Sequence, residues 1–407
     1  MNNAIFSFPL PANEPVKTYL KGSPEREALE AELKKQSSQV IEIPLIIGGK
    51  EVRTGNTGKV VMPHDHRHVL ATYHKAGEKE VQMAIDAAMA AHKEWSELDW
   101  TVRATILLKI ADLIAGKYRA VINAATMLGQ SKNIYQAEID AACELIDFLR
   151  YNAHFAGKLY GFQPKSAPGQ INSVEYRALE GFVFALSPFN FTSIACNLNM
   201  SPILMGNVTV WKPATTAILS NYYLMKVFKE AGVPDGVINF VPGQGSVIGN
   251  VVFNSKHLAG VHFTGSNATF NNLWKQAANN LEKYVSYPRL VGETGGKDFI
   301  FVHPSSCVKE VATAAFCGAF EFQGQKCSAA SRMYVPASLW PSILEAIKAQ
   351  AASITMGDVC DPSNFVNAVI DEASFDNIVS YIELARNSKD AKIVMGGKYD
   401  KSKGYFV

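Results

Sequence analysis

The sequence lacks three features that would each point to a large class of proteins. No apolar stretch approaches the roughly 20 residues that a membrane span requires, so we expect a water-soluble protein. The 39 Lys and Arg residues nearly balance the 37 Asp and Glu residues, which leaves no excess charge to attract nucleic acid or anionic lipid. The chain also contains no internal repeat or low-complexity tract. A globular protein that binds a small molecule is the remaining expectation.

Cysteine is scarce and scattered, which argues against both a disulfide framework and a zinc site. None of the six cysteines forms a CxxC pair: Cys143, Cys196, Cys307, Cys317, Cys327 and Cys360. The alternating His64, His66 and His68 would share one side of a strand and could bind a metal ion, but no acidic or cysteine ligand pattern completes the set. We therefore expect reduced thiols, no metal, and an exposed loop at these histidines.

The amino terminus lacks a recognisable targeting signal. Residues 1–17 contain one lysine and no arginine, and they show neither a secretory apolar core nor an Arg-rich amphipathic pattern. Three Asn-X-Thr triplets begin at Asn190, Asn207 and Asn267, in or beside segments that we expect to hold a cofactor, where a sugar would block function. Secretion is therefore not expected.

Hydrophobic periodicity predicts the order of the secondary structure. A polar amino-terminal arm includes one charged stretch, Glu25–Lys35, that predicts a surface helix. From Glu78 onward apolar residues recur at helical spacing and predict a layer of three helices. Strands and helices then alternate, as in a parallel sheet with helices on its faces. These elements are strands at Phe182–Leu186, Val208–Lys212, Val237–Val241 and Leu258–Phe263, and a helix at Ile218–Glu230.

Two further segments complete the predicted organisation. Residues 161–180 are rich in Pro, Gly, Ser and Asn, and alternation at Ile171–Tyr176 predicts a protruding hairpin open to pairing with a partner chain. After Pro288 a second set of strands is predicted at Phe299–Val302, Arg332–Val335 and Lys392–Met395. We expect an α/β protein with a doubly wound parallel-sheet dinucleotide domain in residues 1–160 and 181–290, a hairpin at 161–180, and a second α/β domain in 291–407.

A candidate nucleophile lies in the segment FEFQGQKCSA, residues 320–329. Cys327 follows a predicted helix through a short turn, where a thiol can be exposed. The neighbouring Lys326 would favour the thiolate, which is the nucleophilic form. Taken alone, a single cysteine is more often buried as a small apolar residue.

Two polar residues are candidates for the remaining catalytic roles. Glu293 precedes two glycines in VGETGGKDF, residues 291–299, where a carboxylate could act as a general base or lie in a solvated turn. Asn190 follows a buried strand in ALSPFNFT, residues 185–192. Its amide could donate to a developing oxyanion or cap a helix.

Two strand ends carry candidate cofactor contacts. Lys212 ends the strand that precedes Pro213, where its ammonium could reach ribose hydroxyls or phosphate, although lone lysines at strand ends are usually solvated. Gly265 and Ser266 lie between a strand and a helix, where amide groups at a helix N-terminus meet a pyrophosphate. The segment HFTGSNATF, residues 262–270, is not the GxGxxG fingerprint, so its general signal is weak.

Together and in this order, the five segments resemble the aldehyde dehydrogenase superfamily from about Asn13 onward. The most specific signatures are ETGGK (293–297) and FEFQGQKCSA. Phe270 stands where the superfamily loop usually has glycine, a departure shared by the 1-pyrroline-5-carboxylate dehydrogenase group. Other phrases similar to that group are SPFNFT, GNVTVWKP (206–213), FTGSNATFNNLWKQ (263–276), GQKCSAASR and QAEIDAACELIDFLRYNA (136–153).

The resemblance implies the aldehyde dehydrogenase fold and NAD-dependent oxidation of L-glutamate γ-semialdehyde to L-glutamate in proline catabolism. It implies that Cys327 attacks the aldehyde, that Asn190 and the Cys327 backbone N–H stabilise the oxyanion, and that Glu293 activates water to hydrolyse the thioester. It further implies NAD contacts from Ser187, Lys212, Gly265, Ser266, Asn267, Ala268 and Thr269, and substrate contacts from Ser328, Phe191 and Glu144.

The resemblance also bears on assembly, compartment and completeness. It implies a homodimer or higher homo-oligomer in the mitochondrial matrix, with the cytoplasm as the alternative. Since the family continues past the position of Val407, we expect a chain truncated at its carboxyl end, with an incomplete catalytic domain. Two alternatives stay open: an inactive partner that only oligomerises through residues 161–180, and a thiol hydrolase that uses Cys327 without a redox step. Lys212 and Gly265 argue against the hydrolase as the main role.

Overall fold

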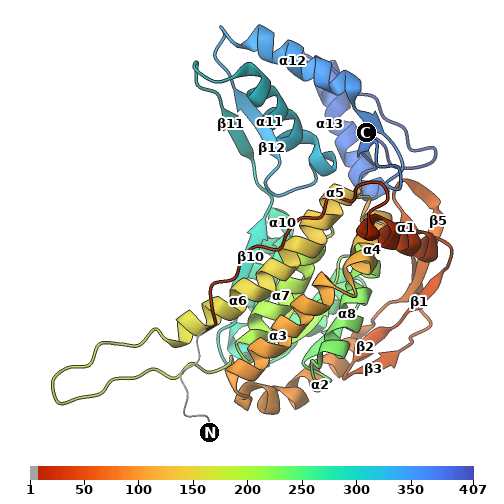
Figure 1. Ribbon diagram of the computed structural model, residues 1–407. Helices are drawn as coiled ribbons and strands as arrows, with labels where there is room; N and C mark the ends of the chain where they lie inside the picture. Colours follow the sequence, from red (N-terminus) through yellow and green to blue (C-terminus); the bar gives the residue numbers. More distant parts are fainter. Residues whose placement is uncertain (1–7) are drawn as a thin grey trace.

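The computed structural model describes residues 8–407. Figure 1 shows a large amino-terminal body, a smaller body from the last part of the chain, and a long loop that projects from the large body. A seven-stranded sheet lies in the large body. Its strands are β2 (Leu45–Ile47), β3 (Lys50–Val52), β6 (Phe182–Leu186), β7 (Val208–Lys212), β8 (Ile238–Phe240), β9 (Leu258–Gly265) and β10 (Arg289–Thr294).

The strand order β10-β9-β6-β7-β8-β2-β3 reverses beside β6. From β6 the chain proceeds outward to β7 and β8, and then returns to place β9 on the other side of β6, all in parallel. β2 and β3 extend the β8 edge with antiparallel pairing. In open parallel sheets, ligands bind at the carboxyl ends of the strands where the order reverses. The topology confirms the expected doubly wound class and locates its crevice between β6 and β9.

Helices cover both faces of this sheet. α7 contacts β6, β7 and β9, and α3, α6 and α8 pack on α7 in a second layer. α2 contacts β6, β7 and β8 and packs against α9. Because parallel crossovers are right-handed, α9 lies on the opposite face of the sheet from α7. The helices of this body are α2 (Glu78–Glu97), α3 (Trp100–Ala115), α4 (Arg119–Gln130), α5 (Ile134–Ala137), η1 (Glu138–Cys143), α6 (Glu144–Tyr160), α7 (Thr192–Leu204), α8 (Ile218–Ala231), α9 (Gly245–Asn254) and α10 (Asn267–Asn279).

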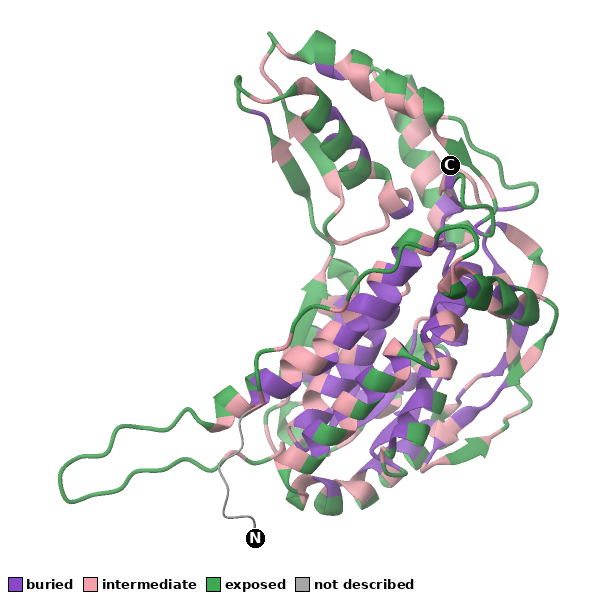
Figure 2. Cartoon of the chain, in the orientation of Figure 1, coloured by how far each residue is buried: buried purple, intermediate pink, exposed green. Residues whose placement is uncertain are grey.

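Burial explains why the central strands are so apolar. All residues of β6 and β7 except their last are buried, as expected for parallel strands covered on both faces. Trp211 in β7 is fully buried and meets the ring of Phe240 edge-on at 5.1 Å between centroids. Figure 2 shows buried residues concentrated in the large body, whereas the smaller body is mostly intermediate or exposed.

The remaining elements form smaller units. A helix and a three-stranded sheet flank the large body, and β1 and β4 both pair with β5. These are α1 (Pro24–Ser37), β1 (Ile41–Ile43), β4 (Thr57–Met62) and β5 (Asp65–His74). The smaller body contains two parallel strand pairs, three α-helices and one 3-10 helix: β11 (Asp298–Phe301), α11 (Val308–Phe320), η4 (Glu321–Gly324), β12 (Ala330–Tyr334), α12 (Trp340–Ser353), β13 (Thr355–Met356), β14 (Asn364–Val366) and α13 (Glu372–Asn387).

The boundary between the two bodies differs from the expected position. β10 pairs with β9 along its whole length, from Arg289 to Thr294, so it is the edge strand of the dinucleotide sheet. The predicted division at residue 290 is therefore four residues too early. Glu293 lies on the last strand of the first body, and the chain crosses to the second body through Gly295 and Gly296.

Two predicted strands are absent, although the elements between residues 182 and 265 match closely. Residues 161–180 project from the body (Figure 1) but form no backbone ladder. Side chains join the two limbs instead: Val174 N–H donates to Gln163 Oε1 at 2.8 Å, and Asn172 Nδ2 donates to the Lys165 carbonyl at 3.0 Å. The strand predicted at Lys392–Met395 is irregular chain.

The exposed loop expected at the three histidines is also wrong. His64 is buried in the turn before β5, and its Nε2 lies 3.4 Å from a carboxylate oxygen of Asp358. His66 and His68 lie within β5 itself and bond to backbone carbonyls. Within residues 8–407, no three His, Cys, Asp or Glu side chains gather as a metal site. Over the same residues, no helix has the length and apolar character of a membrane span.

We predict that Gly181→Ala destabilises the protein by about 3 kcal/mol. Gly181 has φ +151°, and a Cβ there would lie 2.0 Å from the His257 carbonyl oxygen. That same oxygen accepts the hydrogen bond from Phe182 N that begins β6. Urea unfolding of both proteins measures the effect.

Gly245→Ala is the matched control. Gly245 begins α9, and no atom lies within 4 Å of the position that a Cβ would take. Because alanine favours a helix over glycine, its stability should change by less than about 1 kcal/mol. Equal effects of the two substitutions would contradict the steric argument.

Candidate active site

A cleft of about 430 Å³ opens at the carboxyl edge of the sheet, at the reversal beside β6. The residues after β6, β7, β9 and β10 form one wall, and the turn after η4 forms the other. Its lining residues are Leu186, Ser187, Pro188, Phe189, Asn190, Lys212, Ala214, Phe263, Thr264, Gly265, Ser266, Thr269, Thr294, Gly295, Gly324, Gln325, Lys326 and Cys327. The cleft thus joins the predicted cofactor segments to the predicted nucleophile.

The cofactor side of the cleft combines a buried cation with a helix N-terminus. Burial lowers the pKa of Lys212, as expected for an ammonium that has lost water. Ser266 caps α10 by accepting a hydrogen bond from Thr269 N at 3.2 Å. Ser187 is fixed by Trp211, whose Nε1 donates to its hydroxyl oxygen at 2.9 Å. Such a wall suits phosphate and ribose oxygens.

The space beside Gly265 limits which residue can stand in this wall. A Cβ on Gly265, at the end of β9, would lie 2.6 Å from the ring of Phe263, so any larger residue there would require that ring to move. Of the seven predicted cofactor residues, five line the cleft: Ser187, Lys212, Gly265, Ser266 and Thr269. Asn267 and Ala268 lie in the first turn of α10 and are absent from the lining.

A strained turn positions Cys327, the predicted nucleophile. Phe322 and Gln323 have φ of 49° and 57°, a left-handed conformation that costs energy for residues other than glycine. Three hydrogen bonds to residues 367–370 hold this turn. Gln323 Nε2 donates to the Ala368 carbonyl at 2.8 Å, Asn367 N donates to Gln323 Oε1 at 3.0 Å, and Ile370 N donates to Gln325 Oε1 at 2.9 Å.

The three predicted catalytic residues meet across the domain junction. Asn190 Nδ2 donates to the Gln325 carbonyl at 3.0 Å, two residues before Cys327. A Cβ on Gly296 would lie 2.1 Å from the Cys327 carbonyl oxygen, so a glycine is required where the crossing segment touches the cysteine turn. Glu293 is exposed on β10, and its carboxylate is close enough to the Cys327 thiol to raise the pKa of that thiol.

The expected activation of Cys327 by Lys326 is not what the structure shows. Burial, and next the hydrogen bond and charge of Glu293, raise the pKa of the Cys327 thiol to about 11. Lys326 instead directs its ammonium to Asp140 at 3.2 Å and to Glu321 at 3.3 Å, and these carboxylates offset its charge. The thiol is therefore protonated at neutral pH.

A buried charged cluster lies beside the nucleophile. Lys132 is fully buried between the rings of Phe191 and Phe322, at 4.2 and 4.3 Å from their centroids, and it bonds to Asp140 at 2.5 Å. Burial lowers the pKa of Lys132 to about 8. Glu144 lies nearby, and burial raises the pKa of its carboxyl to about 6.

Sequence reasoning missed Lys132 and Asp140 and placed the substrate residues only by resemblance. Phe191 and Glu144 belong to the cluster, and Ser193 donates a hydrogen bond to Glu144. Ser328 is exposed beside Cys327. No local pattern distinguishes a fully buried lysine from a surface one, so Lys132 carries no signal in its own segment.

Comparison with known proteins identifies the arrangement. The profile of the Aldehyde dehydrogenase family matches residues 51–407. The chain belongs to this family. The delta-1-pyrroline-5-carboxylate dehydrogenase, mitochondrial, of Dictyostelium discoideum is 48% identical over 404 residues, which is 98% of this chain and 72% of that relative. The Homo sapiens protein of the same name is 49% identical over 397 residues, 97% of this chain and 70% of that relative.

A solved structure agrees with the sequence comparison. The Delta-pyrroline-5-carboxylate dehydrogenase from Mycobacterium tuberculosis, bound with NAD, has a TM-score of 0.98 and 47% identity. It covers 100% of this chain, which in turn covers 76% of that structure. The two-body aldehyde dehydrogenase fold, with its cleft at the sheet reversal, is therefore shared over the whole of the described chain.

We predict that Glu293→Gln lowers the pKa of Cys327 in this aldehyde dehydrogenase. The substitution removes a negative charge that raises the pKa, while burial continues to hold it above the ordinary thiol value. Below that pKa, alkylation of Cys327 by iodoacetamide should therefore accelerate, by about threefold or more. Peptide mass spectrometry across a pH series measures the rate at this one cysteine.

Glu310→Gln supplies the matched control, because Glu310 lies in the first turn of α11 and is not among the groups that act on Cys327. Its alkylation rate should equal that of the wild type. An unchanged or slower rate in Glu293→Gln would show that the carboxylate does not hold the pKa of the thiol high.

Proposed function

We propose that this chain is an NAD-dependent aldehyde dehydrogenase that oxidises L-glutamate γ-semialdehyde, formed from 1-pyrroline-5-carboxylate, to L-glutamate. The observation that carries the proposal is a single cleft in which Cys327 and Asn190 face the Gly265–Ser266 turn and Lys212. The relatives named delta-1-pyrroline-5-carboxylate dehydrogenase, at nearly half identity over most of the chain, support the choice of substrate.

The first step forms a bond between the cysteine and the aldehyde. Glu293 takes the thiol proton, and the Cys327 sulfur attacks the carbonyl carbon. Asn190 carries two N–H donors, of which one is used by the Gln325 carbonyl. That bond orients the amide, so its second N–H and the Cys327 backbone N–H are available for the developing oxyanion.

The remaining two steps are hydride transfer to NAD and hydrolysis of the thioester. NAD, when bound along Ser187, Lys212 and the α10 N-terminus, accepts the hydride that leaves the former aldehyde carbon, and a thioester on Cys327 results. Glu293, after its first proton has passed to solvent, then takes a proton from water as the water oxygen attacks the thioester. The C–S bond breaks, which releases the carboxylate product and restores the thiol.

The charged cluster is the proposed substrate end of the site. The semialdehyde carries an ammonium and a carboxylate, and Glu144, Lys326 and the hydroxyl of Ser328 offer partners of both signs beside the apolar ring of Phe191. The alternative of an inactive oligomerising partner has no observation in its favour, since this chain itself assembles the cysteine, the asparagine and the cofactor wall.

Assembly and compartment are further parts of the proposal. The projecting residues 161–180 present Phe162 and Ile171 to solvent, with 76% and 93% of their surfaces exposed. Exposed apolar groups on a protruding loop suit contact with a second copy, so we propose a homo-oligomer built through this segment. Relatives from Dictyostelium discoideum and Homo sapiens are named mitochondrial, which supports the mitochondrial matrix.

Cys327→Ala is predicted to abolish NADH formation from NAD and 1-pyrroline-5-carboxylate, measured at 340 nm, because no other cysteine lines the cleft. Cys317→Ala is the control, since Cys317 lies on α11 outside the cleft, and its turnover should match the wild type. Turnover that survives in a folded Cys327→Ala protein would refute the covalent mechanism.

Lys212→Ala should separate cofactor binding from chemistry. We expect the KM for NAD to rise about tenfold, because a charged hydrogen bond to the cofactor is lost, and the KM for the aldehyde to stay within about twofold. Initial rates with each substrate varied in turn provide the test. A change in the KM for the aldehyde alone would contradict the proposal that Lys212 binds the cofactor.

A further inference from the structure

One wide turn, η1, connects α5 to α6 and has functional groups on two opposite faces. A π turn closes on residue i+5, so Glu138 and Cys143 lie one turn apart on the same face, with 3.6 Å between a carboxylate oxygen and the sulfur. Asp140 extends the other way, to Lys132 and Lys326. The turn therefore lies between two polar networks.

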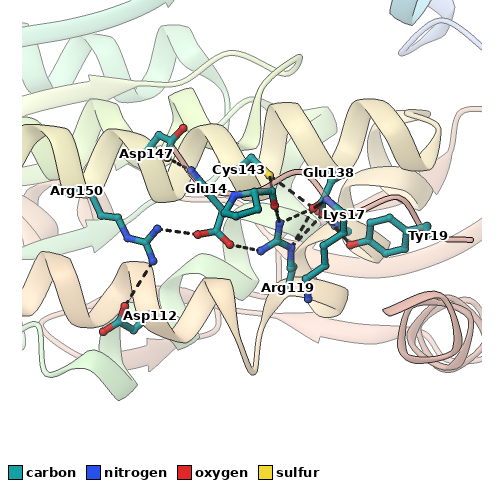
Figure 3. A network of polar contacts seen from close by, with 11 residues as sticks. Glu14, Lys17, Tyr19, Asp112, Arg119, Glu138, Cys143, Asp147 and Arg150 are labelled. Carbon is teal, nitrogen blue, oxygen red and sulfur yellow. Dashed lines mark hydrogen bonds and ion pairs between the residues drawn. The ribbon is translucent and has the colours of Figure 1, made fainter. Parts of the chain in front are cut away.

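The outer network surrounds Glu138, which is fully buried (Figure 3). Arg119 donates from Nε and Nη2 to both carboxylate oxygens. The Lys17 backbone N–H at 2.9 Å, the Tyr19 hydroxyl at 2.7 Å and Asn123 Nδ2 at 2.9 Å complete the set. A buried carboxylate is stable in its charged form only with such partners, and these donors hold the pKa of Glu138 below its ordinary value.

The amino-terminal arm supplies two of these donors and is itself fixed beside the turn. Glu14 bridges Arg119 at 2.6 Å and Arg150 at 2.7 Å, and Arg119 Nη2 also donates to the Pro15 carbonyl at 2.9 Å. Figure 1 shows the arm running along α6 toward α5. Glu138 thus ties the arm, α4 and η1 together at one point.

The inner face of the same turn reaches the nucleophile. Asp140 accepts from Lys132 and pairs with Lys326, the residue before Cys327. Glu144, at the end of the turn, accepts from Ser193 of α7. One short helical segment carries Glu138, Asp140 and Glu144. A change in the register of η1 therefore moves all three carboxylates.

A π turn has poorer intrinsic geometry than an α-helix and persists where its surroundings hold it. If the outer contacts were lost, the segment could tighten toward α-helical register and rotate Asp140 away from the two lysines. A buried ion pair by itself is weak evidence for stability, and its better attested use is to fix one register. This network has the form of such a register device.

We propose that Glu138, clamped by Arg119 and the amino-terminal arm, is a positioning residue that holds η1 in the register at which Asp140 and Glu144 organise the substrate side of the Cys327 site. The effect on substrate rests on the function proposed above. The mechanical coupling from the arm to the cysteine turn does not, because it concerns only contacts within this chain.

Glu138→Gln and the milder Tyr19→Phe test the coupling in two ways. Hydrogen–deuterium exchange should accelerate in peptides that cover residues 320–330, as well as in the arm and η1. In steady-state kinetics the KM for the semialdehyde should rise, by about tenfold in Glu138→Gln and about threefold in Tyr19→Phe, while kcat and the KM for NAD stay within about twofold.

Tyr151→Phe is the matched control. Its hydroxyl donates to Asn13 at 2.8 Å on the exposed side of the arm and touches neither face of η1. It should alter exchange in the arm alone and leave both KM values unchanged. If Glu138→Gln does not fold, Tyr19→Phe tests the coupling by itself. This variant should fold because it removes one hydroxyl and no charge.

The outcomes separate the two proposals. Faster exchange confined to the arm and η1, with residues 320–330 at the wild-type rate, would overturn the coupling whatever the catalytic result. A wild-type chain that forms no NADH from the semialdehyde would instead count against the proposed function, and the exchange measurement would still decide the coupling.

Discussion

The parallel direction of β6, β7, β9 and β10 is the constraint on which the rest of the site depends. Because these strands run the same way, the residues that follow them meet at one edge. Asn190, Lys212, the Gly265–Ser266 turn and Gly295 are separated by many residues in sequence, yet all line one cleft. The cofactor wall is thus a direct consequence of the sheet topology.

Cys327, the proposed nucleophile, reaches that edge from the second body, and the junction must therefore be tight. Gly296 allows the crossing segment to touch the Cys327 carbonyl, and Asn190 bonds to the Gln325 carbonyl in the same turn. The left-handed Phe322 and Gln323 cost energy, and hydrogen bonds to residues 367–370 offset that cost. Precision at the sulfur therefore depends on both bodies.

The sequence predicted the parts of the fold that local pattern determines. β6 and β7 appear at the predicted residues because strands buried on both faces are uninterrupted apolar runs bounded by turns. β10 was assigned to the wrong body because the partner of a strand is not encoded in its own residues: Arg289–Thr294 pairs with β9, about thirty residues earlier. At Ile171–Tyr176 the alternating pattern was present, but Gln163 and Asn172 take the backbone groups that a ladder would need.

The same division separates the site residues that the sequence proposed from the cluster residues that it missed. Short segments with a distinctive sequence contain Cys327, Glu293 and Asn190. By contrast, Lys132 and Asp140 can be recognised only from their burial in the folded chain. The argument from neighbouring residues even predicted the wrong direction for the pKa shift of Cys327. The lysine beside it was expected to favour the thiolate, but Asp140 and Glu321 occupy that ammonium, while burial and Glu293 raise the pKa of the thiol. Two residues that are adjacent in sequence are close in space, but their adjacency does not determine which partner each side chain contacts. The charge state of the Cys327 thiol is therefore a property of the fold.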